Sequence, residues 1–184
     1  MVLTKTPICN FGEKTHDFYL KGIDDKFYNL KNCQGENGTL IMFICNHCPY
    51  VKAIIKDLVN DVNILKKDGI KTVAIMSNDT KNYPEDSFDK MKEFSKTNKF
   101  TFPYLIDATQ EVAKKYGAVC TPDFFGFNKK SELQYRGRLM EMKDLKPIIK
   151  GDSELKIAMK MISKTQNGPK KQIPSMGCNI KWFK

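Results

Sequence analysis

Residues 42–52 read MFICNHCPYVK and place two cysteines, Cys45 and Cys48, where an apolar run gives way to a helical pattern. The run that leads into them, GTLIMFIC at 38–45, is continuously apolar and has the length of a strand that is buried on both faces. From Pro49 onward, apolar residues recur at the spacing of one helix face. The two cysteines are therefore predicted to lie in the turn between a buried strand and a helix.

Segments with strand and helix patterns alternate along the rest of the chain. A hairpin is predicted at 17–32, further strands at 71–79, 102–107, 122–128 and 132–138, and helices at 84–99, 107–118 and from Asp152, as the cap, to 166. Such alternation is typical of an α/β protein with a partly parallel sheet covered on both faces. In these sheets the chemistry gathers at the carboxyl ends of the strands, where Cys45 is expected.

The length of 184 residues suits a single well-packed domain over 1–184, with the last helix and the tail at 151–184 packed on it. No window approaches the roughly 20 apolar residues of a membrane span. The first residues lack an apolar signal-peptide core, so we expect a cytoplasmic protein. Thiols are mostly reduced there, and a pair of cysteines with this spacing is then more often catalytic or metal-binding than structural.

The formal net charge of +10 does not indicate a nucleic-acid partner. Only two of the 31 basic residues are arginines, and the lysines are interleaved with acidic residues along the polar faces of helices. The strongest basic cluster, PKKQ near the tail, is too short to act as a basic arm. We interpret the charge as a solvated lysine surface and expect neither nucleic acid nor membrane as a partner.

The two cysteines have the spacing of a redox pair. A helix N-terminus directs unpaired N–H groups at a thiol that precedes it and lowers its pKa, so we expect the Cys45 thiol to titrate below about 8.5 and to attack. Cys48 would then resolve the mixed disulfide. His47 would favour the Cys45 thiolate as a neighbouring imidazolium, with Asn46 as the other supporting residue. The thiols are themselves the redox group, so no organic cofactor is expected.

A metal site is the second interpretation of the pair. Zinc needs about four ligands, and the sequence has no second pair of cysteines with this spacing. Four distant cysteines remain to complete such a site: Cys9, Cys33, Cys120 and Cys178. We therefore expect no bound metal. A non-catalytic, metal-handling protein stays as an alternative that the metal content would decide.

Several motifs together are similar to those of a known family. The stretches FICNHCPYVK, SNDTKNYPEDS, FPYLID, CTPDFF, YRGR and PSMGCNIKW resemble the redoxin branch of the thioredoxin fold, the AhpC/TSA or peroxiredoxin-like superfamily. They most resemble its subgroup of thiol–disulfide isomerases and thioredoxins, from about residue 8 to 182. The resemblance implies a thioredoxin fold with an N-terminal β-hairpin extension, a mixed central sheet flanked by helices, and a C-terminal helix plus tail.

The resemblance also implies roles for single residues. It makes Cys45 the attacking thiol and Cys48 the resolving thiol, within a thiol–disulfide oxidoreductase. Pro122, after Thr121, matches a cis-proline that faces the pair and meets the substrate backbone. The implied partners are a protein or small-molecule disulfide and a thiol that donates electrons. The oligomeric state stays open between monomer and homodimer.

A thiol peroxidase is the alternative within the same superfamily. The peroxidatic motif Pro-x-x-x-Thr-x-x-Cys, with Cys48 as the reactive cysteine, would put Cys45 at the threonine and Ile41 at the proline. The hydroxyl that activates a peroxide is then missing. The step from Cys48 to Pro49 does match a peroxidatic cysteine, so peroxide remains the alternative substrate.

Four other residues are candidates for the site. Cys120 stands two residues before Pro122 and, like Cys178 in the tail, is either a third redox thiol or a small buried hydrophobic residue. Arg136 and Arg138 are two apart and would share one strand face. They would either contact the substrate or pair with local acidic residues.

Overall fold

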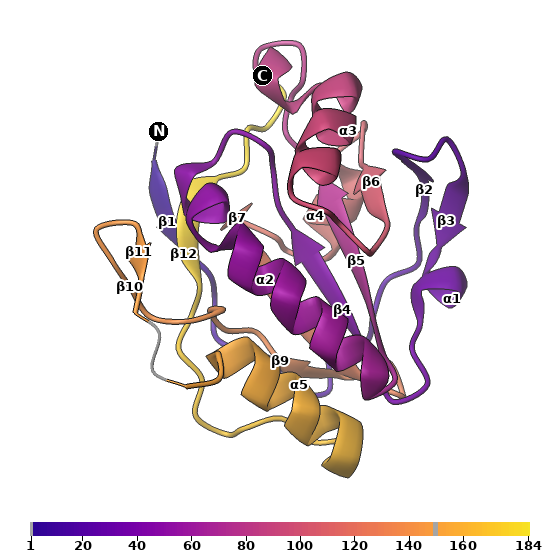
Figure 1. Ribbon diagram of the computed structural model, residues 1–184. Coiled ribbons are helices and arrows are strands. Elements are labelled where there is room, and N and C mark those ends of the chain that lie inside the picture. Colours follow the sequence, from indigo (N-terminus) through magenta and orange to yellow (C-terminus); the bar gives the residue numbers. More distant parts are fainter. Residues whose placement is uncertain (1, 149–150) are drawn as a thin grey trace.

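The centre of the protein is a seven-stranded mixed sheet, seen in a computed structural model that describes residues 2–148 and 151–184 (Figure 1). Its strands run in the order β3-β2-β6-β5-β4-β8-β9. Their bounds are β2 Tyr19–Gly22, β3 Phe27–Asn29, β4 Gly38–Phe43, β5 Ile70–Met76, β6 Tyr104–Ile106, β8 Asp123–Asn128 and β9 Leu133–Tyr135. Strands β4, β5 and β6 are parallel, and β8 pairs antiparallel with β4. The predicted hairpin is β2–β3.

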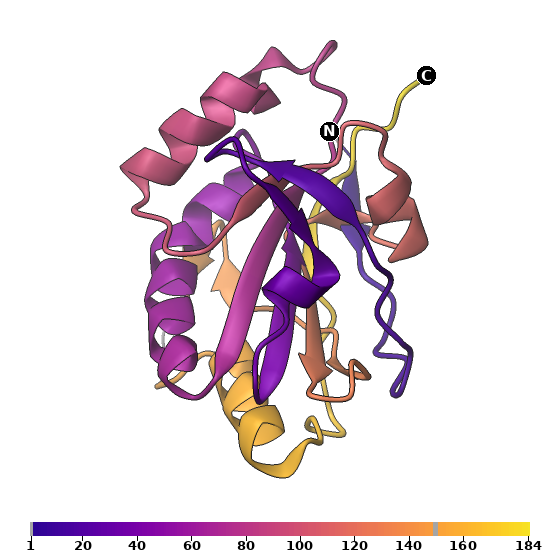
Figure 2. The ribbon, with the colours of Figure 1, turned by 90° about the vertical axis from the view of Figure 1, so that its right-hand side faces the viewer.

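Helices cover both faces of this sheet, as expected (Figure 2). The helices are α1 Leu30–Cys33, α2 Pro49–Lys67, α3 Phe88–Thr97, α4 Glu111–Lys115 and α5 Glu154–Thr165, with a 3-10 helix, η1, at Pro84–Asp86. Strand β4 is buried throughout, and its alternate side chains face opposite layers. Leu40 and Met42 pack with α2 and α5, whereas Ile41 and Phe43 pack with α4. Burial on both faces explains why β4 is continuously apolar.

The sequence correctly predicted that a turn between a buried strand and a helix would hold the two cysteines. Strand β4 ends at Phe43, and α2 begins at Pro49, whose missing N–H is tolerated at the first helical position. The N-cap of α2 is Cys48. The helix ends at Lys67, before Gly69 in the left-handed conformation that favours glycine (φ 76°).

A second, three-stranded sheet was not predicted. It consists of β1 (Leu3–Lys5), β12 (Met176–Asn179) and β7 (Cys120–Thr121), with β12 in the middle. A β-carbon on Gly177 would lie 2.0 Å from the carbonyl oxygen of Thr121, so only glycine permits this close pairing of β12 with β7. Strands of two to four residues leave no periodic pattern in a sequence, which is why the tail was not recognised as a strand. The same holds for the small hairpin of β10 (Met142–Lys143) and β11 (Lys146–Pro147).

Several predicted boundaries were wrong, among them that of the helix predicted at 107–118, which is observed as α4 at Glu111–Lys115. The strand predicted at 132–138 ends at Tyr135, so Arg136 and Arg138 follow it. The helix predicted at 84–99 is divided into η1 and α3. The last helix is capped by Ser153, whose hydroxyl accepts from the N–H of Lys156, whereas Asp152 forms an ion pair with the Lys156 ammonium. Within the described residues, no helix has the length and apolar character to cross a membrane.

Candidate active site

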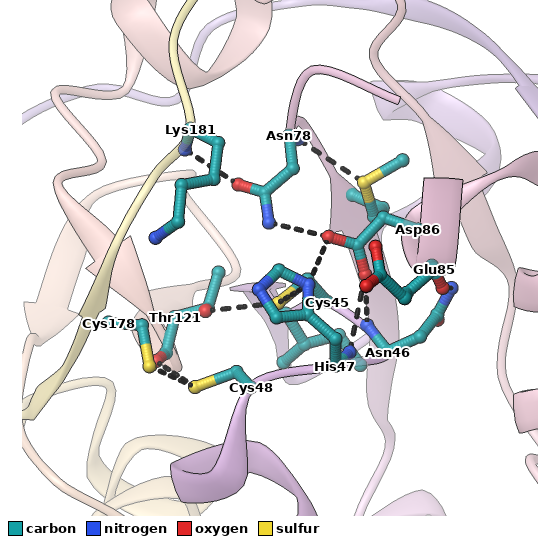
Figure 3. Close-up of polar contacts among 12 residues, drawn as sticks. Cys45, Asn46, His47, Cys48, Asn78, Glu85, Asp86, Thr121, Cys178 and Lys181 are labelled. Carbon is teal, nitrogen blue, oxygen red and sulfur yellow. Dashed lines mark hydrogen bonds and ion pairs between the residues drawn. The ribbon is translucent and has the colours of Figure 1, made fainter. Parts of the chain in front are cut away.

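Three sulfur atoms meet at the start of α2 (Figure 3). The Cys48 sulfur lies 3.0 Å from that of Cys178 and 3.1 Å from the carbonyl oxygen of Thr121. The thiols of Cys45 and Cys48 also affect each other's pKa. Cys45 lies 3.4 Å from the hydroxyl of Thr121 and 3.9 Å from Nδ1 of His47. The bond from Thr121 to Pro122 is cis, as the resemblance implied.

All three of these cysteines are buried, with exposed fractions of 1% for Cys45, 0% for Cys48 and 1% for Cys178. They come from distant parts of the chain, because the first two precede α2 and the third belongs to β12, which pairs with β7. The structure therefore brings one of the two candidate third thiols, Cys178, directly against the pair. We call Cys45, Cys48 and Cys178 the three-cysteine cluster.

Within the cluster, ionisation is favoured at Cys48. Its pKa is lowered to about 5, and the largest cause is the hydrogen bond from Cys45. The thiol of Cys178 and the hydroxyl of Thr121 contribute next. The N–H of Val51 contributes last, and the Cys48 side chain makes no cap hydrogen bond. Burial opposes ionisation, and so does the nearby Thr121 carbonyl, which accepts only from a protonated sulfur. Several donors and the helix N-terminus outweigh that one acceptor.

The expectation that Cys45 has the lower pKa was wrong. The pKa of Cys45 is raised, first because it donates to Cys48, and further by burial and by the charge of Asp86. The helix begins at Pro49, four residues after Cys45, so its N-terminal N–H groups act on the N-cap Cys48 instead. Since the thiolate is the nucleophilic form, this order favours Cys48 as the sulfur that reacts first.

The order of the two pKa values can be tested by the ultraviolet absorbance of thiolates during a pH titration of the reduced protein. We expect one thiolate to appear with a midpoint near pH 5, and this step to be absent from Cys48→Ser. Cys120→Ser is the matched control and should retain it, because burial raises the pKa of Cys120. A step that survives in Cys48→Ser but disappears from Cys45→Ser would assign the charge to Cys45.

Asp86, which was not predicted from the sequence, organises the turn between β4 and α2. This buried carboxylate accepts from the N–H groups of Asn46 (2.8 Å) and His47 (3.3 Å), from Nδ1 of His47 (2.7 Å) and from the side chain of Asn78 (2.8 Å). Burial alone would raise the pKa of Asp86, but the donors from His47 and Asn78 outweigh it and lower the pKa. Its position near the carboxyl end of β5, next to β4 in the sheet, was the signal that could have indicated it.

Asp86 also contacts Asn46 and His47, the two residues between Cys45 and Cys48. It raises the pKa of His47 through their hydrogen bond, so His47 carries a positive charge more readily beside Cys45. Asn46 donates to the carbonyl of Glu85 and accepts from the hydroxyl of Tyr104. Both residues therefore take part in the hydrogen bonds that hold the turn.

Cys45, His47 and Asp86 form the group of side chains in the described part of the chain that could hold a metal ion, since their ligand atoms lie within 4.8 Å of one another. Both carboxylate oxygens of Asp86 already accept from N–H donors, and three protein ligands are fewer than structural zinc requires. The three side chains fit a hydrogen-bond network better than a metal site.

Cys120 fits the interpretation as a small buried residue. Its thiol donates to the carbonyl of Pro122, at 3.6 Å, and burial raises its pKa. Its backbone pairs with Asn179 of β12. Cys120 therefore supports the second sheet.

The two arginines are engaged in ion pairs, which is the second of the two roles considered for them. Arg136 is buried, binds Asp123 at 3.0 Å and donates to the carbonyl of Gly117 at 2.7 Å. Its guanidinium also lies 4.4 Å from the ring centre of Phe125. The expected substrate contact is therefore not supported for Arg136.

A cavity of about 390 Å³ begins next to the cluster. Its wall includes Pro122, beside Thr121, and Tyr50, two residues after Cys48. The remaining wall is mostly apolar and includes Ile54, Leu139, Met140, Met142, Ile173 and Met176. Arg138 also lines the cavity while it pairs with Glu154 at 2.7 Å, so it remains a candidate for substrate contact.

Comparisons with known proteins agree with this arrangement. The model of the AhpC/TSA family matches residues 11–136. The sporulation thiol–disulfide oxidoreductase A of Bacillus subtilis (strain 168) is 26% identical over 117 residues, which are 64% of this chain and 67% of that protein.

Solved structures show the same fold. A crystal structure of an uncharacterized conserved protein from Geobacillus kaustophilus has a TM-score of 0.94 and 38% identity, covering 100% of this chain and 97% of that one. The thioredoxin domain of a thiol–disulfide oxidoreductase from Bacteroides vulgatus has a TM-score of 0.58 and 13% identity, covering 68% of this chain and 86% of that one. The thioredoxin-like fold that the motifs implied is confirmed.

Proposed function

The chain belongs to the AhpC/TSA family, and from that premise we propose that it is a thiol–disulfide oxidoreductase whose Cys45 and Cys48 form and break a disulfide. The observation that carries this proposal is the position of the two cysteines at the start of α2, where Cys48 is the N-cap and Cys45 lies three residues before it, together with the lowered pKa of Cys48. A stabilised thiolate next to a second thiol is the arrangement that thiol–disulfide exchange requires.

The proposed reaction begins with the Cys48 thiolate. It attacks one sulfur of a substrate disulfide, the substrate S–S bond breaks, and the other substrate sulfur leaves as a thiolate that takes a proton. Cys45 then loses its proton and attacks Cys48, which releases the second substrate thiol and leaves a Cys45–Cys48 disulfide. A thiol donor reduces that disulfide and restores the pair. This order reverses the roles that the sequence suggested, because the charge lies on Cys48.

The cavity beside Pro122 supports a disulfide with apolar neighbours as the substrate. Its mostly apolar wall would hold side chains that flank the disulfide, and a substrate in it would lie next to the residues that contact Cys48. A peroxide has no such side chains to place. We extend the proposal to a reducing compartment such as the cytoplasm, where a thiol donor is available.

A thiol peroxidase is the second candidate, favoured by the burial of Cys48 and by its lowered pKa. A small oxidant needs less room than a protein disulfide to reach a sulfur with no exposed surface. Breaking a peroxide bond also requires donors that stabilise the leaving hydroxide. Both arginines of the chain are engaged by carboxylates, Arg136 by Asp123 and Arg138 by Glu154. This argues for disulfide exchange.

One double variant, Cys45→Ser/Cys178→Ser, separates the two candidates, because it leaves Cys48 without a neighbouring thiol that could resolve its adducts. With a disulfide-bonded peptide, we expect a stable mixed disulfide on Cys48, identified by mass spectrometry. With hydrogen peroxide, we expect sulfenic acid to form on Cys48 only at the rate of an ordinary thiolate.

Two outcomes would contradict this proposal. Rapid sulfenic acid formation without a trapped peptide would favour the peroxidase. A mixed disulfide that accumulates on Cys45 of Cys48→Ser, and never on Cys48 of the double variant, would restore the order suggested by the sequence. Cys120→Ser is the matched control, since its thiol donates to the carbonyl of Pro122.

A further inference from the structure

The tail of the chain places a thiol against the reactive cysteine. Cys178 lies in β12, and its sulfur is 3.0 Å from that of Cys48, although 130 positions separate the two residues (Figure 3). A disulfide bond is about 2 Å long, so the two sulfurs are about 1 Å from bonding distance.

The position of Cys178 is held by the backbone rather than by a mobile loop. In β12, Cys178 pairs with Thr121 on one side and with Leu3 on the other. Gly177 permits the close approach to β7, because any side chain there would collide with the carbonyl of Thr121. The register of the second sheet therefore holds this thiol at Cys48.

We propose that Cys178 is a second resolving thiol, which forms a disulfide with Cys48 and thereby releases Cys45. This inference rests on the proposed function and extends it from a pair of cysteines to a three-cysteine cluster. It assigns to β12 a part in the reaction in addition to its structural role.

The exchange needs no further oxidant or reductant. The Cys178 thiolate attacks the Cys48 sulfur of the Cys45–Cys48 disulfide, a Cys48–Cys178 bond forms, and the Cys45–Cys48 bond breaks. Cys45 leaves as a thiolate and takes the proton that Cys178 gave up. When Cys48 instead carries a mixed disulfide, the same attack releases the substrate thiol.

The charges around Cys178 favour this step once Cys48 is oxidised. In the reduced protein, burial and then the hydrogen bond to Cys48 raise the pKa of Cys178 to about 12. A disulfide on Cys48 removes the thiolate that Cys178 faces. The pKa of Cys178 then falls, and its thiol becomes more nucleophilic in the oxidised state.

The test is to oxidise Cys45→Ser in glutathione buffers, to quench the reaction with acid, to alkylate the remaining thiols and then to digest the protein with trypsin. We expect a linked pair of peptides, 32–52 and 172–181, with fragmentation placing the bond between Cys48 and Cys178 rather than at Cys33. The adduct of glutathione on Cys48 should disappear at least about tenfold faster than in Cys45→Ser/Cys178→Ser, because the attack is intramolecular. Cys45→Ala is the second variant if the serine hydroxyl disturbs folding.

Accumulation of glutathione on Cys48, with Cys178 still reduced, would overturn the inference. The wild-type protein in the same buffers tests the proposed function separately, through its Cys45–Cys48 bond. A wild type that forms this bond while Cys45→Ser never links Cys48 to Cys178 would retain the redox pair and reject the second resolving thiol. Cys45→Ser/Cys120→Ser is the matched control and should form the link as Cys45→Ser does.

Discussion

Replacement of Cys48 by serine is expected to slow the reduction of a disulfide substrate by about three orders of magnitude or more. In the proposed reactions Cys48 is the shared member of both disulfides, and its pKa is lowered to about 5. A serine hydroxyl at the same helix N-terminus stays protonated and cannot form a disulfide. The measurement is the single-turnover release of thiol from a small disulfide by the reduced protein.

Cys45→Ser is expected to have a smaller effect on the first turnover, since Cys48 still attacks and Cys178 can still resolve. Cys120→Ser should change the rate little, because the Cys120 thiol contacts the carbonyl of Pro122. A Cys48→Ser protein within about tenfold of the wild-type rate, together with an inactive Cys45→Ser, would show that Cys45 is the nucleophile. Circular dichroism of each variant confirms that the rates compare folded proteins.

Replacement of Arg136 by methionine is expected to lower the free energy of unfolding by about 3–5 kcal/mol at neutral pH, because it leaves the buried carboxylate of Asp123 without its counter-ion. The change also removes the donor to the carbonyl of Gly117 and the guanidinium over Phe125. Chemical denaturation measures the loss in the free energy of unfolding, and we expect the slope of that free energy against denaturant concentration to be unchanged. Arg138→Met is the matched control. Its ion pair with Glu154 is partly exposed and is worth about 1 kcal/mol or less.

The loss in Arg136→Met should depend on pH with a defined sign. Burial raises the pKa of Asp123 to about 6, although Arg136 lowers it. A raised pKa means that the folded state binds the proton more tightly. The resulting stabilisation is present below the unfolded value of about 4 and is lost as pH rises through about 6. Without Arg136 the pKa of Asp123 rises further. At pH 5 Asp123 is then protonated, so the loss of stability in Arg136→Met is smaller than at pH 7. Equal losses at pH 5 and pH 7 would contradict this.

Local patterns in the sequence were sufficient for the main elements. The continuous apolar run predicted β4, because a strand with helices on both sides has no solvent-facing positions. Pro49 and Gly69 marked the two ends of α2, because each has a backbone conformation that suits one end of a helix. The motifs around Pro122 identified the family and the cis peptide bond.

The sequence by itself determined that two cysteines would lie between a buried strand and a helix, since apolar periodicity and capping are local properties. Only the tertiary structure decided which cysteine holds the charge. That depends on where the first turn of α2 begins and on donors that come from other elements. Asp86 and Cys178 likewise reach the site through η1 and β12, and their partners are 39 and 130 positions away. Periodicity carries no information about such pairings, because they are established by the register of a second sheet and the course of a loop.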